Sequence, residues 1–272
     1  MIYYILIAIA AISLASCKKE LEINYCPTDK FYVVTGYTND TITSVRITQT
    51  TDMYNPIDTS IFARLTDATV TLRKSSGKEY DLTPNEFNDF VSTELLAKEI
   101  SEQFDITVKI GKELFTTSAK LMPPVKIDTI IYQSQALVAP IKLHFIQVLT
   151  TKESKTKSYY RYIVRHNGHR ILSSLCNIVS PFPTINQSFI LGTSGEDGKI
   201  IIDTKTKREL HDGDEIEVEV QHLDAHTYNY LYALDIIGQT SNNPPAHFDG
   251  GCLGYYHAYV PNRKSIIYRK PK

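Results

Sequence analysis

Residues 212–237 read DGDEIEVEVQHLDAHTYNYLYALDII, and this stretch holds the two clearest structural signals in the chain. Apolar and acidic side chains alternate from residue 214 to residue 221, which predicts a strand with one face in a core and the other in water. The face expected in the core carries Ile216, Val218 and Val220. The face expected in water carries Glu215, Glu217 and Glu219.

Residues 224–237 change to the spacing of a helix. Apolar side chains recur at Tyr230, Leu234 and Ile237, which lie on one face of a helix, and Asp224 is a suitable N-cap. The sequence therefore predicts one substantial helix at about 224–237, soon after the strand.

Alternation with period two dominates the remainder of the chain, for example from Phe104 to Ile110. These runs are rich in Thr, Val, Ile and Tyr, and turn signals separate them about every ten residues. Met122-Pro123-Pro124 interrupts the pattern, because proline cannot donate to a strand ladder. We therefore expect an all-β chain of two β-sandwich-like domains: an immunoglobulin-like sandwich at 29–122, and a C-terminal β domain at 125–272 with one packed helix.

The composition argues against a nucleic-acid-binding protein and against wholesale disorder. The 272 residues include 29 Lys and Arg against 30 Asp and Glu, a formal net charge of −1, so the chain has no global field that would attract a polyanion. A hydrophobic share of 42% is enough to form cores. The absence of tryptophan disfavours a dedicated carbohydrate-binding platform.

One basic stretch, residues 152–170, departs from this balance. Its cationic side chains, interleaved with tyrosines, are Lys152, Lys155, Lys157, Arg161, Arg165 and Arg170. The favoured interpretation is a hairpin with its charges in water and alternate tyrosines in the core. Contacts with anionic lipopolysaccharide, an acidic ligand or a partner protein are the alternatives left open.

The N-terminus has the features of a lipoprotein signal peptide. Residues 2–15 are apolar and uncharged, and they end in Leu14-Ala15-Ser16-Cys17, which looks like a bacterial lipobox. We expect a signal peptide at 1–16, lipidation of Cys17, a tether at 17–28 and membrane attachment through acyl chains. Lysines rather than an aspartate follow the cysteine, which favours the outer membrane. Because the n-region lacks Lys and Arg, an ordinary signal peptide or an anchor helix is the alternative.

Three cysteines would remain beside the lipidated one: Cys26, Cys176 and Cys252. The number is odd, so at most one intramolecular disulfide can form in an oxidising compartment, and the sequence does not indicate which. The spacings are too wide for a metal knuckle or a redox motif.

No motif points to catalysis, and we expect neither catalytic residues nor a cofactor. Residues 192–195, Gly-Thr-Ser-Gly, lack the spacing of a nucleophile elbow. His222, Asp224 and His226 are a weak candidate for a metal site, because imidazole and carboxylate groups bind zinc. His222 falls at the end of the predicted strand rather than in the helix, so structural or surface histidines are the favoured interpretation.

The segment at 239–251, between the predicted helix and the last strand, is the expected working surface. It is rich in Asn, Pro and Gly, and loops held by a rigid scaffold commonly carry recognition residues. The candidate ligand-binding residues in and after this loop are Asn243, His247, Asp249, Tyr255 and Tyr256.

The order of these motifs resembles a known family. The DGDEIEVEV strand, the HLDAHTYNYLYAL helix, an Asn-Pro-Pro loop and the terminal GGCLGYYHAY are similar to those of Bacteroidota outer-membrane lipoproteins labelled "domain of unknown function 4249". A valine-glycine strand at 34–36, the ATVTL strand at 68–72 and the proline junction extend the resemblance into the first half. The inserted Cys252 departs from the family pattern.

The resemblance implies an accessory role at the cell envelope, since such lipoproteins are often encoded beside TonB-dependent transporters and have no established catalytic residues. We therefore expect an outer-membrane-anchored, non-catalytic accessory or ligand-binding subunit. Its expected partners are the membrane, a TonB-dependent nutrient transporter and an unknown small ligand, with no nucleic acid. A metal-dependent envelope enzyme and a structural or adhesion lipoprotein are the alternatives.

Overall fold

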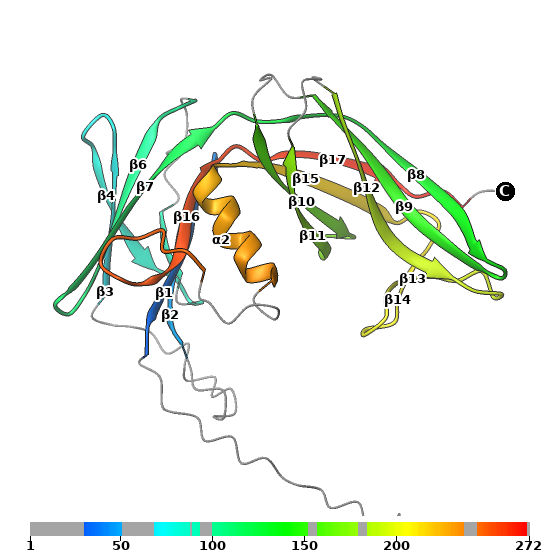
Figure 1. The fold of residues 1–272 in the computed structure, drawn as a ribbon, viewed down its shortest axis with the longest axis horizontal. Coiled ribbons are helices and arrows are strands. Elements are labelled where there is room, and N and C mark those ends of the chain that lie inside the picture. The colour runs from blue at the N-terminus through cyan, green and yellow to red at the C-terminus, as the bar shows by residue number, and fades with distance from the viewer. Residues whose placement is uncertain are drawn as a thin grey trace, which may run out of the picture.

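A computed structural model describes residues 30–50, 68–87, 89–92, 100–151, 157–178, 184–236 and 244–270. These residues form strands β1 to β17 and one helix, α2, arranged as two β-sandwich units (Figure 1). The predicted all-β class with one packed helix is therefore confirmed. The signal-peptide residues, Cys17 and Cys26 lie outside the described residues.

The first unit is a sandwich of seven strands from the N-terminal half. These strands are β1 (Tyr32–Thr38), β2 (Thr43–Gln49), β3 (Ala68–Lys74), β4 (Glu79–Pro84), β5 (Asp89–Ser92), β6 (Gln103–Ile110) and β7 (Glu113–Met122). These strands pair in the order β1-β2-β5-β4-β3-β6-β7, around a core that includes Val34, Leu72 and Phe104. Seven short strands around one core agree with the predicted immunoglobulin-like fold.

An eighth strand, β16 (Leu253–Tyr259), joins this unit from the far end of the chain. It runs parallel to β1 along its length and pairs with the end of β7, so the strand order closes on itself. Gly254 permits the close approach, because a Cβ there would lie 1.7 Å from the carbonyl oxygen of Val34. The C-terminal domain expected at 125–272 is thus interrupted, since a parallel pairing joins segments that lie far apart in sequence.

The second unit packs two sheets face to face. Their strands are β8 (Lys126–Val138), β9 (Ile141–Thr151), β10 (Ser158–His166), β11 (His169–Ile178), β12 (Thr184–Ser194), β13 (Ile200–Asp203), β14 (Arg208–Leu210), β15 (Glu215–Leu223) and β17 (Asn262–Ile267). One sheet has the order β14-β13-β12-β9-β8 and the other β11-β10-β15-β17. Apolar side chains of both sheets share a core, and Tyr160 and Tyr162 lie in it as the alternation of the basic stretch predicts.

Helix α2 (Ala225–Ile236) packs against β16, β10 and β11, and Figure 1 shows it beside β16. The Thr227 backbone N–H donates to Asp224 Oδ1 (2.8 Å) and the Thr227 hydroxyl donates to Oδ2 (2.7 Å), which confirms the predicted N-cap. The predicted buried face is wrong at Leu234, which is 40% exposed. The helix instead buries the side that carries Thr227, Tyr228, Tyr230 and Leu231, because it contacts β16 and the second unit together. Among the described residues, no helix has the length and apolar character needed to cross a membrane.

Candidate functional site

The sheet β11-β10-β15-β17, here called the charged sheet, has a polar face on the side away from its core. The alternation in β15 places Glu217, Glu219 and Gln221 on this face, as predicted. The prediction that the glutamates face water is wrong for Glu219, which is 1% exposed. Strand β16 contacts β15 and closes off this part of the sheet. A buried carboxylate requires partners, so this face has to supply cations.

A groove of about 530 Å³ lies between the charged sheet and the first unit. Residues of β10, β11, β15 and β17 form one wall, and residues of β1, β2, β5 and β16 form the other. Among the described residues, the lining includes five arginines but only two carboxylates: Arg46, Arg161, Arg165, Arg170 and Arg263 against Asp89 and Glu219. The groove is therefore cationic, although the chain as a whole is balanced.

Two of these arginines share the buried carboxylate. Glu219 Oε2 accepts hydrogen bonds from Arg165 Nη1 at 3.0 Å and from Arg263 Nε at 2.8 Å. Glu219 Oε1 accepts one from Gln221 Nε2 at 2.6 Å, and Arg165 also reaches Glu217 at 2.8 Å. Burial raises the pKa of Glu219, but the hydrogen bonds from Gln221 and Arg263 and the charges of the arginines outweigh burial. The pKa therefore lies below its ordinary value, and the carboxylate stays charged.

A third arginine, Arg46 on β2, is held by Asp89 on β5. Arg46 Nε and Nη2 donate to the two carboxylate oxygens at 2.6 and 2.8 Å. This is the bidentate geometry that matches a guanidinium to a carboxylate. It joins neighbouring strands of the first unit at the edge of the groove.

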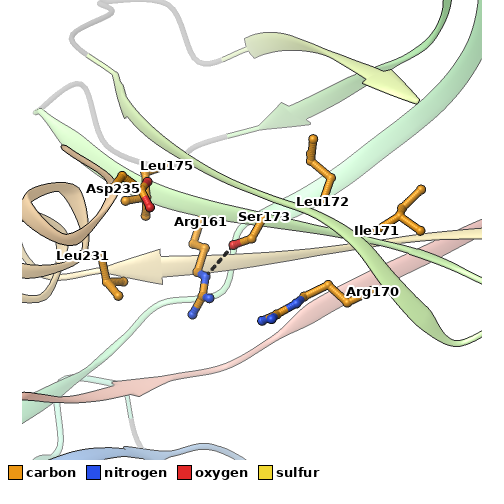
Figure 2. Close-up of a pocket in the computed structure, with 8 residues that line it drawn as sticks. All are labelled: Arg161, Arg170, Ile171, Leu172, Ser173, Leu175, Leu231 and Asp235. Atoms are coloured by element: carbon orange, nitrogen blue, oxygen red, sulfur yellow. Dashed lines mark hydrogen bonds between the residues drawn. The ribbon is translucent and has the colours of Figure 1, made fainter. Parts of the chain in front are cut away.

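Arg161 on β10 and Arg170 on β11 differ from the other three, since no described Asp or Glu lies within ion-pair distance of either. Arg161 Nε donates to Ser173 Oγ at 2.9 Å (Figure 2). Both arginines also line an adjoining cavity of about 410 Å³, together with Leu231 and Asp235 of α2. Figure 2 shows the two guanidinium groups extending to the same side of the sheet. The groove and the adjoining cavity thus meet at two unpaired cations.

His257 forms part of the wall on β16. It is 3% exposed, and among the described residues neither ring nitrogen has a partner in hydrogen-bond geometry. Burial lowers the pKa of His257 to about 4, and the charge of Arg161 adds to the lowering, while Asp224 and the Gly36 backbone oppose it only in part. The ring is therefore neutral at pH 7.

Tyr259 belongs to the same wall as His257, and Gln221 on β15 belongs to the opposite one. The His257 ring stacks on Tyr259, with 4.7 Å between the ring centroids and an interplanar angle of 7°. Gln221 Oε1 is buried and also lacks a hydrogen-bond partner in the described part of the chain. Buried polar atoms without partners are uncommon in native proteins. Both residues, His257 and Gln221, are buried, so these atoms lie beneath the surface of the groove.

The structure separates the five predicted ligand-binding residues. Tyr255 lines the groove, whereas Tyr256 points into the core of the first unit. His247 Nδ1 accepts the backbone N–H of Tyr256 at 3.0 Å, and Asp249 pairs through its backbone with β7. Asn243 lies outside the described residues. The described part of the 239–251 loop therefore packs on the first unit, and Tyr255 is the predicted residue that reaches the groove.

The three residues of the candidate metal site take separate positions. His222 Nδ1 lies 3.1 Å from the backbone carbonyl of Pro123, and Asp224 caps α2. His226 stacks against His247 with 6.0 Å between the centroids. Among the described residues, no group of three or more His, Cys, Asp or Glu side chains is arranged to hold a metal ion. The described structure thus gives each of these residues a local role in packing or capping.

The two described cysteines are both free. Cys252 is buried in the core of the first unit, and Cys176 packs against the core of the second. They therefore do not form a disulfide with each other, and Cys26 lies outside the described residues. Burial raises the pKa of the Cys252 thiol to about 12, which keeps it protonated and unreactive.

A hydrogen-bonded chain of Tyr132, His144 and Ser194 crosses three strands of the second unit. The Tyr132 hydroxyl lies 2.5 Å from His144 Nδ1, and His144 Nε2 lies 2.8 Å from Ser194 Oγ. A serine beside a histidine is the arrangement of an activated nucleophile. Ser194 is buried, however, so its hydroxyl is closed to a substrate. We assign the chain a structural role, because it satisfies buried polar groups across β8, β9 and β12.

The sequence identified Arg161, Arg165 and Arg170 as a basic stretch, with charges in water as the favoured interpretation and an acidic ligand among the alternatives. Their alternation with core tyrosines was the available signal, because it places the arginines together on the opposite face. Arg263 in the same sheet and His257 in the opposite wall carried no such signal, since β16 and β17 come more than eighty residues later in the chain.

Comparison with known proteins adds a family to this description. Residues 18–250 match the model of the family described as "Domain of unknown function (DUF4249)". No curated protein matches the chain. Among solved structures, a two fibronectin type III domain segment from chicken tenascin aligns with 88% of this chain and 100% of its own length, at 10% identity and a TM-score of 0.23.

Proposed function

Because the chain belongs to the DUF4249 family, whose description names no activity, we propose a function from the groove: a lipid-anchored outer-membrane protein that binds a small ligand without chemical conversion. In this proposal it acts as an accessory subunit beside a TonB-dependent nutrient transporter. The observation that carries the proposal is the cationic groove, in which Arg161 and Arg170 have no carboxylate partner among the described residues.

The size and walls of the groove support ligand binding. Its volume of about 530 Å³ falls within the range of small-molecule pockets, roughly 300–1,000 Å³. Most of its lining lies on strands rather than on loops, and rigid elements hold recognition groups in fixed positions. Tyr255 and Tyr259 add aromatic surface to the polar groups. A small molecule with polar groups fits such a lining.

The state of the titratable groups supports binding rather than catalysis. Both oxygens of Glu219 already accept hydrogen bonds, and its charge is stabilised by two arginines. A carboxylate in this state is a poor general base, because its pKa lies below the ordinary value. An efficient general base has a pKa close to the working pH. Burial lowers the pKa of His257 to about 4, so its ring is neutral at pH 7. The groove therefore favours recognition of charge over transfer of protons.

The membrane location in the proposal rests on the lipobox. Replacing Cys17 with Ser removes the thiol that would carry the lipid. We expect the wild-type chain to incorporate labelled palmitate and to fractionate with outer membranes, and the Cys17→Ser chain to do neither. Palmitate labelling that survives the substitution contradicts a lipid anchor at this residue.

The partner and the ligand are tested together on the native lipoprotein. Pull-down from solubilised membranes is expected to recover a TonB-dependent transporter, and mass spectrometry of the recovered protein is expected to find a bound small molecule. Ser44 lines the groove from β2, so Ser44→Trp is expected to exclude the small molecule and leave the transporter bound. Thr48→Trp, on the same strand but outside the groove lining, is the matched control. Recovery of the chain alone, without transporter or ligand, contradicts the proposal.

A further inference from the structure

Building on the proposed ligand site, we infer that the ligand carries an oxyanion, a carboxylate or phosphate group, bound between Arg161 and Arg170 where the groove meets the cavity beside α2. The class of ligand follows from the charges that the described residues leave unsatisfied. Neither comparison with known proteins nor the family description assigns a ligand.

The five arginines of the groove differ in whether they contact a carboxylate. Arg46, Arg165 and Arg263 each contact a carboxylate at 2.6 to 3.0 Å. Arg161 and Arg170 have no such partner in the described chain, although they line the same groove. Three of the five guanidinium groups are therefore paired with carboxylates. The other two, Arg161 and Arg170, line both the groove and the adjoining cavity. Guanidinium groups match carboxylate and phosphate oxygens with paired hydrogen bonds.

The register between β10 and β11 places two arginines side by side. Arg165 on β10 lies directly opposite Arg170 on β11, and like charges at such a position destabilise a sheet. Arg165 is compensated by Glu217 and Glu219, which leaves the charge of Arg170 unopposed at the rim. An anion bound beside Arg170 would compensate this remaining charge.

The opposite wall of the groove is formed in part by β16. His257 on β16 lines the groove opposite Arg161 and is close enough for that charge to act on its ring. Tyr255 and Tyr259 of the same strand also line the groove. A ligand whose oxyanion pairs with the arginines brings its remaining atoms against this strand. The oxyanion is therefore placed at the arginines and the rest of the ligand in the groove.

One carboxylate stands against anion binding at this place. Asp235, exposed near the end of α2, lines the adjoining cavity without an ion pair to either arginine among the described residues. Its charge opposes an incoming anion. Asp235→Asn is therefore expected to tighten oxyanion binding, which a merely structural role for the arginines does not predict.

The test uses the purified, detergent-solubilised native lipoprotein and calorimetry at low salt. Inorganic phosphate and succinate are the two oxyanion probes, and maltose is the neutral one. We expect phosphate or succinate to bind, with the stronger of the two identifying a phosphate or a carboxylate ligand. Arg161→Gln and Arg170→Gln are each expected to weaken binding about tenfold, and moving from 50 to 200 mM KCl is expected to weaken it severalfold. Arg73→Gln, which removes an exposed arginine of the first unit outside the groove, is the matched control.

A lysine variant separates the effect of charge from that of hydrogen-bond geometry, and several outcomes would contradict the oxyanion site. Arg161→Lys keeps the positive charge but loses the planar guanidinium that donates paired hydrogen bonds. It is expected to weaken binding less than Arg161→Gln. Failure of the wild type to bind either oxyanion, or equal binding by wild type and both glutamine variants, overturns the inference. Recovery of a neutral molecule that Ser44→Trp excludes overturns the oxyanion but leaves the proposed function standing. Recovery of no molecule at all, together with no effect of Ser44→Trp, overturns both.

Discussion

Glu219 shows how a single residue sets the charge balance of the groove. It sits in a regular apolar–acidic alternation, yet it is buried and holds two arginines and a glutamine side chain. Removing one partner from such a buried network leaves charges without compensation, which costs more than the network contributed in the first place. The residue is therefore the most sensitive electrostatic position in the charged sheet.

We expect Glu219→Gln to lower the free energy of unfolding by about 2–4 kcal/mol at pH 7, measured by urea denaturation. Glu217→Gln, which removes a half-buried partner of Arg165, is the matched control and is expected to cost less than about 1 kcal/mol. The folded pKa of Glu219 lies below its ordinary value of 4.5, so its contribution is present above pH 4.5 and is lost as the pH falls through the folded pKa. The difference between wild type and Glu219→Gln should therefore shrink in acid, and a constant difference contradicts this account.

His257 makes a second pH prediction of the same sign, at higher pH. Its folded pKa is about 4 against an ordinary 6.5, so the unfolded chain takes up a proton first as the pH falls. Stability attributable to this ring is complete above pH 6.5 and is lost toward pH 4, by up to about 3 kcal/mol. His257→Phe keeps an aromatic ring against Tyr259 without a titrating group, so the variant should lose less stability than wild type between pH 7 and pH 5. His169→Phe, at an exposed histidine, should keep the wild-type slope in the same denaturation series.

At the scale of elements, local pattern predicted the strands and the helix but not what covers them. The alternation in β15 and the Asp224 cap are both present, because each depends on neighbours within a few residues. The burial of Glu219, the exposure of Leu234 and the groove itself depend on β16 and the first unit, which reach these residues only through tertiary packing. Of the predicted ligand-binding residues that the structure describes, Tyr255 alone lines the groove, because alternation along β16 sends Tyr256 into the core.

The helix cap gives the prediction at this scale. Asp224→Ala removes two hydrogen bonds at the start of α2 and is expected to cost about 1 kcal/mol, read from the shift of the urea midpoint. Asp235→Ala, near the other end of the same helix, serves as the control. A negative charge near a helix C-terminus is unfavourable, so this change is expected to be neutral or slightly stabilising. Equal losses from both substitutions would refute capping as the cause.

At the scale of the whole molecule, β16 ties the two units together. The chain passes from β15 and α2 of the second unit into the first unit as β16, and then returns to the second as β17. Within β16, Tyr256 and Ala258 enter the core of the first unit while Tyr255, His257 and Tyr259 line the groove. The strand that closes the first sandwich is thus also a wall of the candidate site. Disturbing its pairing should therefore affect both units and the ligand at once.

Gly254 is the residue at which this coupling is most directly tested. Its φ of +120° and the 1.7 Å separation between a built Cβ and the Val34 carbonyl oxygen leave no room for a side chain. We expect Gly254→Ala to lower the free energy of unfolding by more than about 3 kcal/mol and to speed hydrogen exchange in β1 and β7. Because β16 also borders the groove, β10 and β15 should lose protection in the same experiment. Gly195→Ala, at a glycine with open space and ordinary φ, should leave both units as protected as wild type. Loss of protection confined to the first unit would mean that the two sandwiches unfold independently, and that the groove is held by side-chain contacts alone.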